Sequence, residues 1–282
     1  MKSKMKLLSA FVIIVFLANN SFAQYYYQDI IAAQQATEKW KLYKDNKIKS
    51  VAISSFENNN QPTEGFECKQ TVAKDYSQIS TYTKTGYTRE TTLISYYNAN
   101  GILQKTIDTS KNYRSSTAYL FDASGNISSI TNSSIETTGG IKNSEQHIWK
   151  YGADGKPLSM QKIKNNSDTT FINFVKDENG NIAEEYGVHN KAAMPTIYYY
   201  YDDNRRLTDI VRYNEKAKRL LPDYIFTYND NNKLSAMLFV PEGSNDYEKW
   251  VYDYNDKQLR TMETCFNKQK EVLGKIEYDY KF

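Results

Sequence analysis

The chain has 282 residues, and its 36 basic and 33 acidic side chains give a formal net charge of +3. So small an excess of positive charge excludes the basic footprint typical of nucleic-acid-binding proteins, and no nucleic-acid partner is expected. Aromatic residues make up 14% of the chain, including 25 tyrosines, which argues against an intrinsically disordered protein.

Residues 1–23 have the features of a signal peptide. Three lysines precede an apolar run from Leu7 to Ala18, and the small residues Ser21 and Ala23 precede the predicted cleavage site. The run is shorter than the roughly 20 residues that a membrane span requires, so no stable span is expected after cleavage. The sequence therefore predicts an exported protein that is periplasmic, on the outer surface or secreted.

Residues 24–40 are predicted to form an N-terminal helix or cap. Asp29 can serve as the N-cap, and an extended entry strand is the alternative to a helix. A helix at this place would cover the open first edge of a sheet. Apolar and aromatic residues recur at helical spacing among good helix formers at Ile30, Ala33, Thr37 and Trp40.

Residues 41–282 are predicted to form a β-hairpin repeat domain. In each copy an aromatic residue precedes a turn rich in Asp, Asn, Ser and Gly, and an aliphatic residue follows, as in Phe121–Ile127. Arg205 and Asn232 replace the turn glycine, which predicts a different turn type or a left-handed Asn. The spacing averages about 26 residues, as in repeat proteins. The residues before the turns, here called index residues, are Tyr43, Lys74, Tyr97, Phe121, Tyr151, Lys176, Tyr201, Tyr228 and Tyr254, with Tyr280 starting a truncated copy.

A second aromatic residue lies two positions before the index residue in seven successive copies. Residues two apart on a strand point to the same face of a sheet, whereas intervening residues such as Lys150 are mostly polar. We therefore expect one buried aromatic face and one wet face. The seven aromatic residues of the buried face are Tyr119, Trp149, Phe174, Tyr199, Phe226, Tyr252 and Tyr278.

Nine hairpin units require about eighteen strands, more than an open twisted sheet holds without curling. The predicted fold is all-β: a long antiparallel meander coiled into an open spiral or incomplete barrel, with the aromatic face inward and a short N-terminal helix. A β-propeller is the alternative, because two copies together have the length of one blade.

Three stretches, Tyr199–Asp202, Tyr252–Asn255 and Phe121–Ile127, resemble the YD repeat of bacterial RHS and eukaryotic teneurin proteins. The resemblance covers about residues 90–282. It implies a shell of β-sheet and, as in some family members, carbohydrate binding or the carriage of a toxin. The chain is far shorter than a toxin-enclosing shell, so we carry over only the sheet architecture and a surface-binding role.

Few residues offer catalytic chemistry. His147 and His189 have no partner at motif spacing and are interpreted as structural or surface residues. Cys68 and Cys265 are interpreted as isolated thiols, although export leaves a disulfide open. Asp177–Asn181 reads as a hairpin turn, because it lacks the terminal glutamate of a calcium loop. We predict no catalytic residue, no metal ligand and no cofactor.

Two tyrosines are the candidate binding residues. Tyr198 and Tyr200 point away from Tyr199 and Tyr201, so they are exposed if the latter pair is buried. Exposed aromatic rings can stack on sugars or anchor a protein partner, whereas a cross-strand pair that stabilises the wet face is the alternative. We expect a non-enzymatic scaffold of the bacterial cell envelope that binds a glycan or an envelope protein. The alternatives are a polymer hydrolase with scattered carboxylates and a purely structural component.

Overall fold

The computed structural model describes residues 25–86, 90–140, 142–241, 244 and 246–282. In this part of the chain one helix, α1 (Gln28–Asp45), precedes nineteen strands. The strands are β1 (Ser50–Glu57), β2 (Glu67–Val72), β3 (Gln78–Lys84), β4 (Thr91–Tyr97), β5 (Leu103–Ser110), β6 (Tyr113–Phe121), β7 (Ile127–Glu136), β8 (Lys142–Tyr151), β9 (Pro157–Lys164), β10 (Asp168–Lys176), β11 (Ile182–His189), β12 (Ala192–Ala193), β13 (Ile197–Tyr201), β14 (Leu207–Asn214), β15 (Arg219–Tyr228), β16 (Leu234–Phe239), β17 (Glu248–Tyr254), β18 (Arg260–Phe266) and β19 (Val272–Lys281).

The predicted signal peptide, residues 1–23, lies outside the described residues. No helix in the described ranges combines the length and the hydropathy that crossing a membrane requires.

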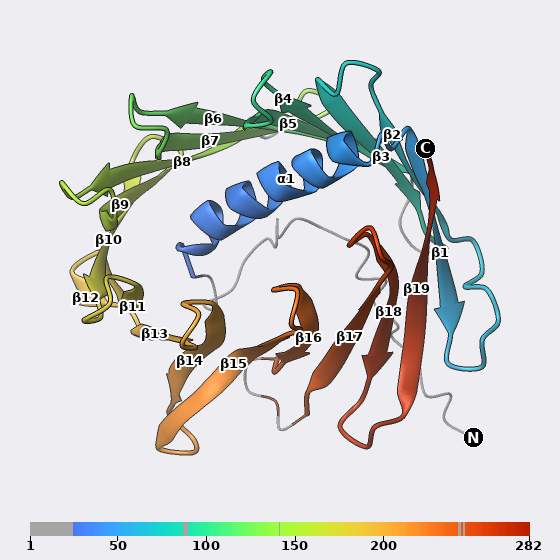
Figure 1. Ribbon diagram of the computed structural model, residues 1–282. Helices are drawn as coiled ribbons and strands as arrows, with labels where there is room; N and C mark the ends of the chain where they lie inside the picture. The colour runs from blue at the N-terminus through green and yellow to red at the C-terminus, as the bar shows by residue number, and fades with distance from the viewer. Residues whose placement is uncertain (1–24, 87–89, 141, 242–243, 245) are drawn as a thin grey trace.

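The strands form one antiparallel sheet that closes on itself (Figure 1). Strand β1 pairs with β2 on one side and with the last strand, β19, on the other. Strand β12 has only two residues, so eighteen longer strands form the wall. The all-β meander with one N-terminal helix is confirmed, and the open spiral or incomplete barrel is wrong. Closure gives β1 and β19 a partner on both sides and leaves neither as an open edge.

Helix α1 lies inside the ring of strands (Figure 1). The prediction that it covers an open edge is therefore wrong. The helix also continues past Trp40 to Asp45, and the predicted first index residue, Tyr43, is a buried helical residue. The next one, Lys74, lies within the turn between β2 and β3. The repeats therefore follow the predicted frame from Tyr97 on.

Trp40 fastens the second half of the helix to the wall. Its indole Nε1 donates a hydrogen bond of 2.7 Å to the carbonyl oxygen of Tyr76. Its ring lies against Gly101, where an added Cβ would be 2.1 Å from the ring atom Cε3. Gly101 also has a φ of +79°, so both space and backbone conformation require glycine there.

The core lies between the helix and the inner face of the wall. Inward positions such as Cys68, Gln70 and Val72 on β2 are buried, and the positions between them are exposed. One cluster of buried residues surrounds Trp40, and a second surrounds Trp149. The prediction of one aromatic inner face is confirmed. Of the seven aromatic residues, Trp149, Phe174, Tyr199 and Tyr252 are buried, and Tyr119, Phe226 and Tyr278 are half-buried against the two clusters.

The hairpin turns share one geometry. In the copies from Tyr97 on, the side chain after the index residue accepts backbone N–H bonds from two and four residues further on, as Asp202 does from Asn204 and Arg206. The exception is the turn at Gly152, where Asp154 accepts the N–H of Lys156. Gly125 has a φ of +83° at the fourth turn position, and Arg205 and Asn232 have a φ of +59° at the same place. The left-handed Asn232 is thus confirmed. A different turn type at Arg205 is wrong, because its side chain takes the left-handed conformation within the common turn.

A hydrogen bond between copies repeats around the barrel. The index tyrosine of one copy donates its hydroxyl to the carbonyl oxygen six residues after the preceding index residue. Strand pairing between the copies begins only two residues further on, so the tyrosine satisfies a carbonyl that the ladder leaves open. The five bonds run from Tyr151 to Ile127, Tyr201 to Ile182, Tyr228 to Leu207, Tyr254 to Leu234 and Tyr280 to Arg260, at 2.8–2.9 Å.

Candidate binding groove and helix seat

Strand β13 carries the two candidate tyrosines on its outer face. Ile197 and Tyr199 point inward and are buried, with Tyr199 only 3% exposed. Tyr200 points outward and is 47% exposed, and the outward Tyr198 is half-buried. The predicted orientation of the pair is confirmed.

Both tyrosines line a solvent-open groove. The groove follows the seam between β11 and β13 and is bounded by the β10–β11 and β13–β14 turns. Four carboxylates and one guanidinium line it, so its charge is predominantly negative. The polar and charged lining residues are Asp177, Asn179, Asn181, Glu184, Asp202, Asp203 and Arg205.

The groove lies at the most weakly paired seam between copies. Only two residue pairs join β11 to β13, Glu184 to Tyr198 and Glu185 to Ile197. The corresponding seams from β5 onward have four to seven pairs. Pairing stops because the intervening chain folds onto β11 as β12 and then reaches Pro195, which has no N–H to donate to a ladder.

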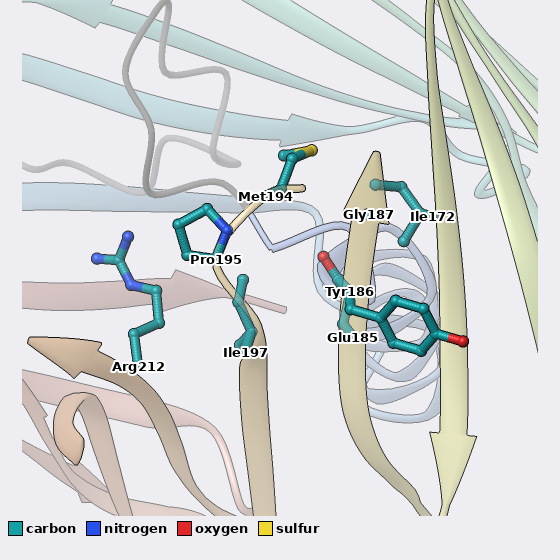
Figure 2. Close-up of a pocket in the computed structure, with 8 residues that line it drawn as sticks. All are labelled: Ile172, Glu185, Tyr186, Gly187, Met194, Pro195, Ile197 and Arg212. Carbon is teal, nitrogen blue, oxygen red and sulfur yellow. The ribbon is translucent and has the colours of Figure 1, made fainter. Parts of the chain in front are cut away.

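Figure 2 shows how this break is filled: Met194 and Pro195 lie between Arg212 on one side and Gly187 and Ile172 on the other, around a small pocket. A Cβ on Gly187 would lie 2.5 Å from Cδ1 of Ile172 and 3.0 Å from Sδ of Met194. Because Gly187 has no side chain, Met194 and Ile172 can pack against it and fill the break between β11 and β13.

On the inner face of the same seam, Glu185 holds the start of helix α1. Its carboxylate accepts bonds from the backbone N–H of Tyr26 at 2.8 Å and of Tyr27 at 2.9 Å, and from the hydroxyl of Tyr199 at 2.7 Å. Tyr27 is the N-cap residue and makes no side-chain cap, so the expected cap at Asp29 is wrong. Burial raises the pKa of Glu185 to about 7, although the bonds from the Tyr26 amide, the Tyr199 hydroxyl and the Tyr27 amide favour its charged form.

Asp29 instead joins an ion-pair chain through His147. The Nδ1 atom of His147 lies 2.6 Å from Oδ2 of Asp29, and Nε2 lies 3.0 Å from Oε1 of Glu145. Burial opposes the charge on His147, but the two carboxylates outweigh it and raise the pKa to about 9. Lys162 continues the chain, with Nζ 3.2 Å from Oε2 of Glu145. His147 is thus a structural residue that fastens the helix to β8.

The remaining candidate residues have structural surroundings. His189 lies 3.1 Å from Asp168 and half-exposed. Cys68 and Cys265 are free, and burial raises the pKa of both thiols, that of Cys265 to about 12. They are the isolated thiols that the sequence predicts. Among the described residues, no group of three or more His, Cys, Asp or Glu side chains could hold a metal ion.

Sequence reasoning missed Glu185. It lies nine residues after the index residue Lys176, a position on the aromatic face where other copies have Ile130, Met160 or Ile210. Glu263 stands at the same position after Tyr254. An alignment of the copies would have shown two acidic residues on an apolar face, which is the signal for buried polar partners.

No family model matches the chain, and no curated protein does. Solved structures that resemble it include a porin-like protein from Bacteroides uniformis, with a TM-score of 0.41 and 7% identity over 83% of this chain and 98% of that one. A porin-like protein from Bacteroides vulgatus has a TM-score of 0.29 and 10% identity over the same shares. The Photorhabdus luminescens Tc holotoxin pore has a TM-score of 0.30 and 8% identity over 83% of this chain and 17% of that one.

Proposed function

We propose that the protein is an exported, non-enzymatic repeat scaffold of the bacterial cell envelope that binds a glycan in the groove of Tyr198 and Tyr200. One observation carries this proposal: the two tyrosines share the outer face of β13 beside two polar turns. Tyrosine rings offer apolar faces to sugar rings, and the turn side chains offer acceptors and donors to sugar hydroxyls.

The charge of the groove favours a particular class of glycan. The four carboxylates of Asp177, Glu184, Asp202 and Asp203 outnumber the nearby cations, which are Arg205 in the lining and Arg206, paired with Asp202 at 2.6 Å. Such a lining repels acidic polysaccharides and suits uncharged or amino-bearing sugars. We therefore expect neutral oligosaccharides and amino sugars to bind better than uronic-acid or sulfated chains.

The pKa values of two groove carboxylates, Asp177 and Asp202, support binding rather than hydrolysis. Hydrogen bonds from Arg206 and from turn amides hold the pKa of Asp202 below its usual range. The pKa of Asp177 is also lowered, because bonds from Asn181 and the turn amides outweigh its desolvation. A glycosidase needs one carboxylic acid with a raised pKa beside the scissile bond, whereas ionised carboxylates accept bonds from sugar hydroxyls.

The YD-repeat resemblance remains part of the proposal. The shared turn and the repeated tyrosine bond supply a physical reason for the recurring aromatic–Asp pair.

Export rests on residues 1–23. The test is to recover the protein from the periplasm or medium and sequence its N-terminus, which should begin at Gln24. Recovery from the cytoplasm with residues 1–23 intact would contradict export.

A glycan array tests the binding role. We expect retention of neutral or amino-bearing oligosaccharides, and at least a tenfold weaker affinity after Tyr198→Ala with Tyr200→Ala, or about 1.4 kcal/mol. Tyr213→Ala is the matched control, because Tyr213 is an outward tyrosine on β14, 46% exposed, that does not line the groove. Equal losses in both variants, or no retained glycan, would reject the proposal.

A protein ligand is the second candidate, because exposed apolar residues lie on the outer face of β10 and β11, towards the end of these strands away from the groove. Phe171 on β10 pairs with Val188 on β11, and they are 54% and 39% exposed. Large exposed apolar patches mark protein-binding surfaces. Replacing both with serine should leave glycan retention unchanged, and a loss of envelope-protein capture in that variant would favour this second role.

A further inference from the structure

We propose that ligand occupancy of the outer groove and seating of helix α1 inside the barrel are coupled through the seam between β11 and β13. The inference rests on the proposed binding function for its ligand, but not for its mechanism. The groove and the helix seat occupy opposite faces of the same two strands.

The residues of the two sites alternate along each strand. On β11, Glu184 lines the groove and its neighbour Glu185 holds the helix. On β13, Tyr198 and Tyr200 are outward, and Tyr199 between them donates to Glu185. A shift of either strand that changes the groove must therefore move a residue of the seat.

The seam is also the part of the wall best able to shift. Two residue pairs hold β11 to β13, and Pro195 prevents the ladder from extending. Across this seam the inner face is tied by the Tyr199–Glu185 bond and by the bond from Tyr201 to the carbonyl of Ile182. Seating of the helix depends on the same contact, because Glu185 is the acceptor for Tyr199 and for the amides of Tyr26 and Tyr27, which lead into the helix.

A ligand that spans the groove would contact both turns and hold them together. It would thereby align Glu185 with Tyr199 and strengthen the hold on the helix. The coupling has a positive sign, and thermodynamic linkage requires that a better-seated helix also tightens ligand binding by the same factor.

A cross-link can replace the ligand in the test. Glu178→Cys and Asp203→Cys place exposed thiols at equivalent positions of the two groove turns, which a flexible bis-maleimide can join. The buried Cys68 and Cys265, whose thiol pKa values are raised, should not react. Ala99→Cys with Ala123→Cys places the same link across the β5–β6 seam as the matched control.

Hydrogen exchange at the Tyr26 and Tyr27 amides is the readout. We expect exchange to slow by about fivefold or more when the groove turns are cross-linked, relative to the same variant capped with a mono-maleimide. The control link should change these amides little. No slowing at the groove, or equal slowing in the control, would overturn the coupling.

A second arm uses chitohexaose, cellohexaose and maltohexaose with the unmodified protein. A sugar that binds the groove without slowing exchange at Tyr26 and Tyr27 would also overturn the coupling. If none of the three binds while the cross-link still slows exchange, the coupling stands and glycan binding is the part that fails.

Discussion

Glu185 and Glu263 stand at the same position of two copies of the repeat, in opposite parts of the barrel wall. Each points inward and accepts a bond from the tyrosine two residues before the next index residue, Tyr199 or Tyr278. Glu263 also accepts a bond of 2.8 Å from the guanidinium of Arg260. Glu185 instead accepts the backbone N–H groups of Tyr26 and Tyr27, the two residues directly before helix α1.

The difference shows how one repeat position can serve two purposes. A buried carboxylate is costly unless it is paired and hydrogen-bonded. At Glu263 the repeat supplies its own cation six residues after the index residue. At Glu185 the donors come from outside the repeat, because they are the two backbone amides directly before helix α1.

The largest effect should come from the aromatic face beside Glu185. Trp149 is 4% exposed and stacks on Phe174 at 5.3 Å between ring centroids. Trp149→Ala should lower the free energy of unfolding by about 3–5 kcal/mol and loosen adjacent copies first. Lys150→Ala, on the outer face of the same strand, should change it by less than about 0.5 kcal/mol. Equal effects in urea denaturation would show that the assigned inner face is wrong.

Replacing each glutamate in turn tests whether Glu185, and not Glu263, holds the start of helix α1. Glu185→Ala leaves the N–H groups of Tyr26 and Tyr27 without their acceptor, and should cost about 3 kcal/mol. Exchange of those two amides should become faster. Glu263→Ala should also destabilise the barrel, because it strips Arg260 of its carboxylate, but those two amides should keep their protection at low denaturant. Faster exchange of the Tyr26 and Tyr27 amides in both variants would contradict the assignment of this contact to Glu185.

The pH dependence of stability should identify the helix seat. The pKa of Glu185 rises from 4.5 in the unfolded chain to about 7, so its contribution is full below pH 4.5 and is lost as the pH rises to 7. That of His147 rises from 6.5 to about 9, so its contribution is lost between those values. Each is worth about 3 kcal/mol at most. Melting temperatures should therefore fall from pH 5 to pH 9, and Glu185→Gln should flatten the acidic part. A Gln variant with the original slope would contradict the assignment.

Local rules accounted for much of the wall. The turns follow from Asp, Asn and Gly at short spacing, and the inner face follows from aromatic residues two apart on each strand. The outward placement of Tyr198 and Tyr200 follows from the same alternation. The prediction of Tyr43 as the first index residue failed, because this helical aromatic residue fits the repeat spacing by chance.

Closure and the helix seat depend on contacts that no local pattern contains. The barrel closes because Ser50 and Lys281 come into register at opposite ends of the chain. Glu185 lies 159 residues from Tyr26, the amide that it binds. The groove depends on the short pairing of β11 with β13, which ends after two residue pairs near Pro195. The short pairing can be recognised only when the copies of the repeat are aligned.

The smallest expected effect concerns the tyrosine bonds between copies. They occur at four successive index residues from Tyr201 to Tyr280, in the part of the wall that contains Glu263. Before Tyr201 the index residues differ: Tyr151 makes the same bond to Ile127, but Phe121 has no hydroxyl and Lys176 pairs with Asp154. Tyr228→Phe removes only the hydroxyl and leaves the carbonyl of Leu207 without that donor, at a cost of about 1 kcal/mol.

The matched change is Tyr200→Phe, which removes an outward, 47% exposed hydroxyl and should cost almost nothing. Thermal melts of the two variants should differ by a few degrees, with Tyr228→Phe the lower. The loss at Tyr228 should be the same in a Glu185→Gln background, because distant sites with no shared partner add. A loss that grows or vanishes in that background would show that the two parts of the wall are not independent.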